Sequence, residues 1–207
     1  GVAVIGQTAD LAPADKALYA LRDVTATVDS VPLIASSILS KKFASGAKAI
    51  VLDVKTGTGA LIPTLEDSIA LAQAMVDIGR EAGRGVIAVV SGMDEPLGSH
   101  VGNALEVKEA IDVLAGRARG PLLEMALFLG GQMLMASGLA KDAAAARRML
   151  EGALASGAGL EKLREMIVAQ GGDGGVCGDT GLLPKAPCIT PVRARRDGYL
   201  SHVNGTA

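Results

Sequence analysis

Residues 49–60 read AIVLDVKTGTGA, a continuous apolar run of strand length that ends in a glycine-rich turn. Such a run, closed by glycines, is typical of a parallel strand that is buried on both faces. Apolar side chains then recur at helical spacing in residues 66–82, and residues 85–90 return to the composition of a strand. This order predicts a βαβ unit, and therefore an α/β fold with a parallel or mixed sheet flanked by helices.

The segments before this unit carry their own boundary signals. Residues 2–5 predict a short buried strand, and Asp15 can cap a helix of residues 16–28. A second helix is predicted for residues 32–44, because a proline suits its first turn and Gly46 ends it. A pair of helices is therefore expected before the sheet.

Helical patterns dominate the second half of the chain. Four helices are predicted there, separated by glycine or polar breaks: residues 101–114, 122–136, 142–155 and 160–169. Beyond them, residues 189–192 and 198–203 have the composition of short antiparallel strands. The chain is thus expected to end at the start of an antiparallel β region.

The composition argues against several classes of function. A chain of 207 residues with 49% hydrophobic and 20% charged residues is typical of a soluble globular protein. Only 2% of the residues are aromatic and the net charge is −2, so a nucleic-acid partner is not expected. No stretch approaches eighteen apolar residues, so no membrane partner is expected. Cys177 and Cys188 form no CxxC pair, which favours reduced thiols in the cytoplasm over a zinc site.

The densest polar group lies in residues 15–42. Tyr19 and Arg22 are three residues apart, and Ser37 and Lys41 are four apart, so each pair lies on one face of its helix. Two adjacent helices would direct both pairs into one pocket. Such a pocket suits a planar ligand with carbonyl acceptors, and its two cations would stabilise negative charge on a departing heterocycle.

A simpler interpretation of these residues stays open. Arg22 would pair with Asp23 or Asp29, Lys41 would be a solvated helix end, and Ser37 would fill space in a helix of small residues. The spacing of the side chains does not by itself decide between this and the pocket.

Two loops invite ligand hypotheses of lower specificity. Residues 57–59 could cradle a phosphate, but they lack both the GxGxxG and the GxxxxGKS spacing, which favours a tight turn. Carbonyls of residues 96–103 together with Glu109 could hold a hard cation, or that segment is an ordinary helix cap. His100 and His202 have no partner at motif spacing, so structural roles are expected for them.

On these residues the sequence resembles the thymidine phosphorylase and pyrimidine-nucleoside phosphorylase family. The resemblance is carried most specifically by LYALRDVTATVDS (residues 18–30) and the SKK string after it, then by residues 49–60 and by EPLGSHVGNALEVKEAI (residues 95–111). It extends over essentially all 207 residues, including GQTADLAPADK (residues 6–16) and DGYLSHVNG (residues 197–205).

The resemblance implies a pentosyltransferase. In that family phosphate attacks the anomeric carbon of thymidine, deoxyuridine or uridine and releases the base and a (deoxy)ribose 1-phosphate. Carried over to this chain, the base contacts are Tyr19, Arg22, Ser37 and Lys41, with Arg22 and Lys41 as the catalytic pair that stabilises the leaving base. The partners implied are a pyrimidine nucleoside, phosphate and a second copy of the chain in a cytoplasmic homodimer of nucleoside salvage.

The resemblance also implies a structural K⁺ in some members, and no required cofactor. Its ligands here would be the carbonyls of Leu97 and His100 and the carboxylate of Glu109, although His100 replaces the small residue expected at its position. The family's Lys-and-Ser, glycine-rich phosphate loop lies upstream and has no counterpart here. No phosphate-binding residue is therefore expected in this chain, which alone is expected to be inactive.

The same resemblance divides the chain into four parts. Residues 1–14 are expected to be a strand and hinge of an α/β domain, and residues 15–44 part of a small helical domain. Residues 45–185 would form the central α/β domain, and residues 186–207 the truncated start of a C-terminal α+β domain.

Two other functions remain as alternatives. A catalytically incompetent remnant would act as a structural or binding module. A related phosphoribosyltransferase would need a diphosphate loop and two magnesium-binding acidic residues, and the sequence offers neither convincingly.

Overall fold

The computed structural model describes residues 2–4, 11–201 and 203. Its centre is the predicted βαβ unit, in which strand β1 (Ala49–Thr56) leads through helix α3 (Leu65–Glu81) to strand β2 (Gly85–Gly92). The strands pair in parallel from Ala49↔Gly85 to Thr56↔Gly92. The α/β class and the parallel sheet are therefore confirmed.

Local chemistry explains the boundaries of this unit. Thr64 precedes α3 and its Oγ1 accepts a hydrogen bond from the Asp67 N–H at 3.2 Å, which satisfies one of the donors left open at a helix start. On β1 the side chains of Ile50, Leu52 and Val54 are buried, whereas Asp53 between them is more exposed. One face of the strand therefore enters the core.

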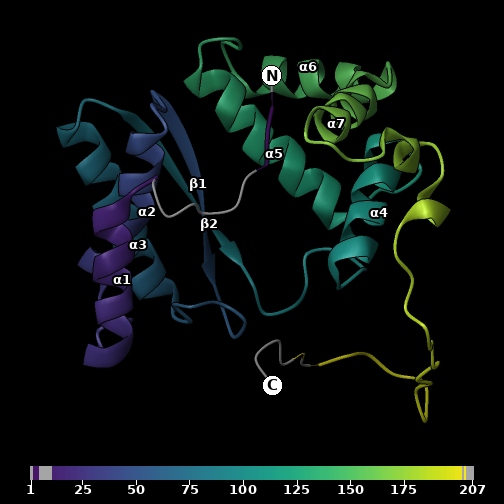
Figure 1. The fold of residues 1–207 in the computed structure, drawn as a ribbon, viewed down its shortest axis with the longest axis horizontal. Helices are drawn as coiled ribbons and strands as arrows, with labels where there is room; N and C mark the ends of the chain where they lie inside the picture. Colours follow the sequence, from purple (N-terminus) through teal and green to yellow (C-terminus); the bar gives the residue numbers. More distant parts are fainter. Residues whose placement is uncertain (1, 5–10, 202, 204–207) are drawn as a thin grey trace.

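The sheet lies between two layers of helices (Figure 1). Helices α3 and α2 (Val31–Ala44) lie on one side, with α1 (Pro13–Thr25) beyond them, and α5 (Pro121–Ala136) lies on the other. The core residues come from α2, β1, α3 and the loop between the last two: Ile34, Ala35, Leu39, Ile50, Leu52, Val54, Ile62, Leu71, Ala72 and Met75. Helix α2 is thus packed firmly against the βαβ unit.

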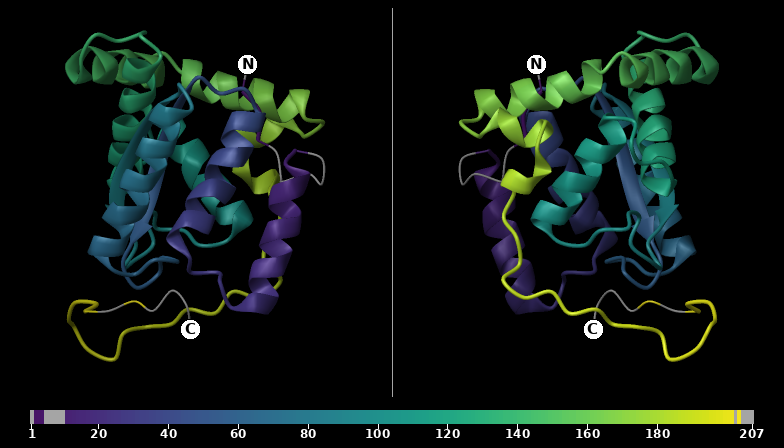
Figure 2. Two further views of the ribbon diagram at one scale, coloured as in Figure 1. Left: turned by 90° about the vertical axis from the view of Figure 1, so that its left-hand side faces the viewer. Right: turned by 90° about the vertical axis from the view of Figure 1, so that its right-hand side faces the viewer.

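The remaining helices gather on the far side of α5 (Figure 2). They are α4 (Asn103–Leu114), α6 (Ala143–Ala155) and α7 (Ala158–Ala169), followed by two 3₁₀ turns, Gly174–Cys177 and Thr180–Leu182. Together with α5, these three helices agree with the bounds of the four predicted helices to within a few residues. No helix in the described part of the chain is long and apolar enough to cross a membrane.

Three local predictions differ from the structure. Helix α1 begins at Pro13 and Asp15 lies inside it, so Asp15 is not the cap; a proline in the first turn needs no hydrogen-bond partner for its nitrogen. The helix ends at Thr25 rather than at residue 28, because Ala26 adopts a left-handed conformation with φ 52°. Residues 2–4 form no strand, and Ile5 lies outside the described residues.

The predicted strands of the tail are also not formed in the described residues 186–201 and 203. Ile189, Val192, Tyr199 and Leu200 are almost fully exposed. A strand needs a neighbouring strand for its hydrogen bonds, and the described part of this segment is paired with none.

Candidate functional site

Helices α1 and α2 bring the predicted polar residues together. Tyr19 and Arg22 lie on α1 with Asp15, at spacings of four and seven residues that place all three on one helix face. Ser37 and Lys41 lie one turn apart on α2. The pairing of two helices that the spacing predicted is therefore observed, with Asp15 as an additional member.

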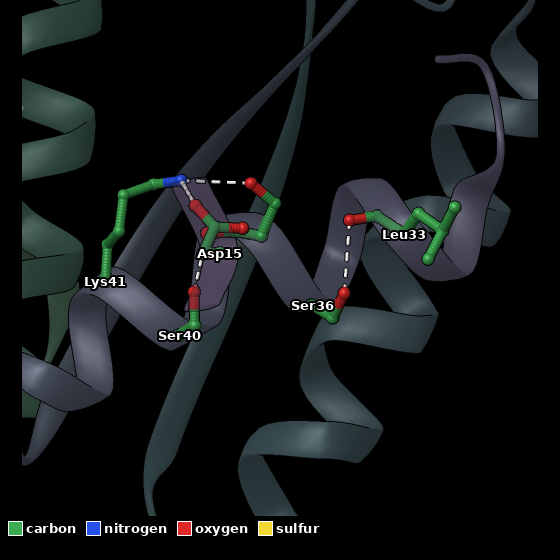
Figure 3. A network of polar contacts seen from close by, with 6 residues as sticks. Asp15, Leu33, Ser36, Ser40 and Lys41 are labelled. Carbon is green, nitrogen blue, oxygen red and sulfur yellow. Dashed lines mark hydrogen bonds and ion pairs between the residues drawn. The ribbon is translucent and has the colours of Figure 1, made fainter. Parts of the chain in front are cut away.

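The centre of the group is a partly buried ion pair (Figure 3). Lys41 Nζ lies 2.6 Å from Asp15 Oδ2, and it also donates a hydrogen bond to Ser37 Oγ at 3.0 Å. Asp15 is 8% exposed and the Lys41 side chain 23%. Lys41 is thus held by two partners, and its alternative role as a solvated helix end is not what the structure shows.

The electrostatics around Asp15 keep it ionised. Burial raises the pKa of this carboxyl group, but the hydrogen bond from Lys41, the nearby Ser37 hydroxyl and the positive charges of Lys41 and Arg22 outweigh burial and hold the pKa below its usual value. Lys41 is the ion-pair partner of this carboxylate, and the charge of Arg22 on the same helix adds a smaller effect.

Arg22 is anchored by the backbone rather than by an aspartate. Its Nε donates to the carbonyl of Thr27 at 3.4 Å and its Nη2 to the carbonyl of Val28, so it binds carbonyls that follow the end of α1. The guanidinium carbon lies 5.1 Å from the centre of the Tyr19 ring. Arg22 is 5% exposed, whereas Tyr19 is 47% exposed. The expected alternative pairing with Asp23 or Asp29 is not formed.

Glu109 on α4 organises the second candidate site. Its carboxylate accepts hydrogen bonds from the backbone N–H of Ser99 at 2.8 Å and of His100 at 3.0 Å. His100 Nδ1 lies 3.2 Å from the same carboxylate, without forming a hydrogen bond to it. The hydrogen bond from Ser99 lowers the pKa of Glu109; burial opposes this, and the contacts with His100 add to it. Glu109 is thus occupied as an anchor of the loop.

The cation hypothesis for this loop remains a prediction. Glu109 and Leu97 line one cavity of about 570 Å³ with His100. No cluster of three or more His, Cys, Asp or Glu side chains suited to a metal occurs among the described residues. Backbone carbonyls would have to supply most of the ligands.

The glycine loop after β1 is a closed turn in which every amide of residues 57–60 has an acceptor. Gly57 N–H donates to Pro63, Gly59 N–H to Met93 and Ala60 N–H to Gly57, while the Thr58 N–H donates to Asp94 Oδ1 at 2.9 Å. Gly57 has φ +113°, and a Cβ there would lie 2.6 Å from that aspartate oxygen. The amides face protein acceptors, which agrees with the tight-turn interpretation rather than with a phosphate cradle. His202 lies outside the described residues.

One further polar group was not predicted from the sequence. Near the carboxyl end of the strands, Lys55 Nζ lies 2.7 Å from Asp53 Oδ2 and donates to Ser91 Oγ at 2.9 Å. Asp53 and Lys55 are two residues apart on β1, a spacing that places both side chains on one face of a strand. That spacing was the available signal.

Comparison with known proteins identifies the family of this chain. Residues 1–160 match the family model described as "Glycosyl transferase family, a/b domain". This chain belongs to that family.

Within the family, the chain is similar to pyrimidine-nucleoside phosphorylases. It is 53% identical over 202 residues to the enzyme of Geobacillus stearothermophilus and 52% identical over 202 residues to that of Staphylococcus aureus (strain USA300). Each match covers 98% of this chain and 47% of the relative. The chain therefore spans about half the length of the relatives it matches.

Proposed function

We propose that this chain carries the base-binding half of a pyrimidine-nucleoside phosphorylase. It is supported above all by one observation: Lys41 of α2 is paired with the buried carboxylate of Asp15 on α1, the helix that also carries Arg22. The names of relatives that are more than half identical to the chain support the same reaction class.

The proposed reaction is the reversible phosphorolysis of a pyrimidine nucleoside such as thymidine, deoxyuridine or uridine. An oxygen of phosphate forms a bond to the anomeric carbon while the bond from that carbon to the base nitrogen breaks. The electron pair of the broken bond moves onto the base, which leaves as an anion or takes up a proton. The products are the free base and a (deoxy)ribose 1-phosphate.

The chain's own residues would act on the leaving base. Arg22 and Lys41 would donate hydrogen bonds to its carbonyl oxygens, where the negative charge develops, so they stabilise the transition state more than the bound substrate. Ser37 would bond the ring nitrogen. Tyr19, half exposed beside the Arg22 guanidinium, would pack on the ring. No nucleophile from the protein is needed.

The remaining family properties are proposed with it. A K⁺ ion would be held by the carbonyls of Leu97 and His100 and by Glu109, in a structural role. Phosphate would be bound outside this chain, which agrees with the occupied amides of residues 57–60. The protein would be a cytoplasmic homodimer, with residues 15–44 belonging to a small helical domain and residues 45–185 to the central domain.

The test uses the natural gene product that contains this sequence. It is incubated with uridine or thymidine and phosphate, and release of the base is followed. Phosphate-dependent release supports the proposal, and no turnover of either nucleoside contradicts it in favour of a binding module without activity.

The variant Arg22→Ala probes the assigned site. We expect it to lower kcat/KM for the nucleoside by at least about 2–3 kcal/mol of transition-state stabilisation, because a charged donor is lost from a closed site. Unchanged kinetics would remove Arg22 from its assigned role.

A further inference from the structure

We infer that Asp15 is the positioning residue of the base site: it joins the α1 half to the α2 half and orients the ammonium group of Lys41. This inference rests on the proposed function, and it adds a residue that acts through Lys41 rather than on the base. Asp15 does not itself contact the base in this assignment.

The first step is the connection between the helices. Arg22 and Tyr19 project from α1, whereas Ser37 and Lys41 project from α2. In the part of the chain that the structure describes, the Asp15–Lys41 pair is the one ion pair between these two helices. Helix α2 is fixed by the core, so the position of α1 depends strongly on this contact.

The second step concerns the direction of the Lys41 donors. An ammonium group carries three N–H donors. One is directed at Asp15 and one at Ser37, and the third finds no acceptor among the described residues. With two donors fixed, the direction of the third is fixed as well. A ligand carbonyl therefore meets a donor that is already oriented.

The third step is the charge of the group. Arg22 and Lys41 contribute two positive charges and Asp15 one negative charge, which leaves one net positive charge for one departing anionic base. The lowered pKa of Asp15 keeps this balance at neutral pH. Without Asp15, the Lys41 ammonium group would have no anion beside it and would have lost one of its two hydrogen-bond partners.

The test compares Asp15→Asn with Asp23→Asn in the natural gene product. Asp23 lies on the same helix and is exposed, so its variant makes the same change of charge away from the site. For Asp15→Asn we expect KM for the nucleoside and Kd for free uracil to rise about tenfold, the effect of losing a charge-assisted contact. KM for phosphate should stay within twofold, and Asp23→Asn should match the wild type.

This pattern separates positioning from a general loss of folding. A merely structural role would reduce the active fraction, which lowers kcat and leaves both KM values unchanged. The inference would be overturned by a lower kcat with both KM values unchanged. It would also be overturned by an equal rise of both KM values or by an unaltered KM for the nucleoside. If the wild-type protein itself releases no base, the proposed function fails; if it turns over normally and Asp15→Asn does too, only the role of Asp15 fails.

A second variant covers the case in which Asp15→Asn does not fold. Asp15→Glu keeps the charge and displaces the carboxylate by one methylene. The ion pair with Lys41 is then kept, but the Lys41 ammonium group points in a different direction. Its nucleoside KM should rise about threefold, less than a full loss of the contact would produce, with phosphate KM unchanged. A nucleoside KM equal to that of the wild type would overturn the inference.

Discussion

Asp15 and Glu109 are both buried carboxylates with a lowered pKa, yet they are held in opposite ways. Asp15 is bound by a side-chain cation that keeps a donor for something else. Glu109 is bound by the peptide N–H groups of Ser99 and His100, which have no other donor to offer.

The two carboxylates therefore have different roles. A carboxylate that orients a cation also fixes the direction in which this cation can donate a hydrogen bond to a ligand. A carboxylate that binds peptide groups fixes the path of a loop. We therefore expect changes around Asp15 to act on substrate kinetics and changes around Glu109 to act on stability.

The largest effect is expected for Lys41→Met in the natural gene product. The variant should lower kcat/KM for the nucleoside by about 2–3 kcal/mol, because a charged donor to the leaving base is lost. It should also lower the free energy of unfolding by about 1–3 kcal/mol, because Asp15 is left buried without its cation. Steady-state kinetics and thermal unfolding measure the two effects.

Two further variants check that interpretation. Lys42→Met, at an exposed neighbouring position, should leave both quantities unchanged. Adding Asp15→Asn to Lys41→Met should recover stability without recovering activity, since the unpaired charge is removed but the donor is still missing. Recovery of activity in the double variant would contradict the role of Lys41.

A smaller effect, on stability alone, is expected for Glu109→Gln. The folded pKa of Glu109 lies below its ordinary value of 4.5, so its ionised form contributes stability that is present above that pH and is lost as the pH falls through the folded pKa. At pH 7 the variant should melt a few degrees below the wild type. The gap should close as the pH falls below 4.5.

Melting curves at several pH values decide this prediction. A gap that persists unchanged at acid pH would mean that the shape of Glu109, not its charge, supports the loop. A rise in nucleoside KM without loss of stability would place Glu109 with Asp15 and break the comparison.

The smallest effect is expected for Asp94→Ala. Asp94 is exposed and, like Glu109, binds a peptide N–H, that of Thr58. Losing one such hydrogen bond should cost about 0.5–1.5 kcal/mol in the free energy of unfolding. The variant should bind inorganic phosphate no better than the wild type in an NMR titration. A clear gain in phosphate binding would show that this carboxylate masks an anion site.

The sequence predicts the fold well where periodicity is strong. The apolar run of residues 49–54 and the helical spacing of residues 66–82 predict the βαβ unit, and the structure confirms it. The helical spacing also predicts that Tyr19 lies beside Arg22 and Ser37 beside Lys41, and the members of each pair are in contact in the structure. These features depend on the spacing of residues that are close together in the sequence, so that spacing is enough to predict them.

Contacts between residues that are far apart in the sequence could not be predicted from such spacing. Asp15 is as compatible with a helix cap as with an ion pair to Lys41, and only the packing of α1 on α2 decides between them. The tail has the composition of strands, but a strand forms only where it finds a partner, which composition does not report. The assignment of the base site itself remains a proposal.

Arg22 adds a thermodynamic consequence. Its guanidinium is already held by the carbonyls of Thr27 and Val28, and the side chain is buried, so its rotational freedom is lost during folding. Ordering a long side chain upon association costs about 0.5–1.5 kcal/mol. A ligand that binds to Arg22 would not have to overcome this loss of conformational entropy. The hydrogen bonds of Arg22 to residues 27 and 28 would therefore make the binding free energy of that ligand more favourable.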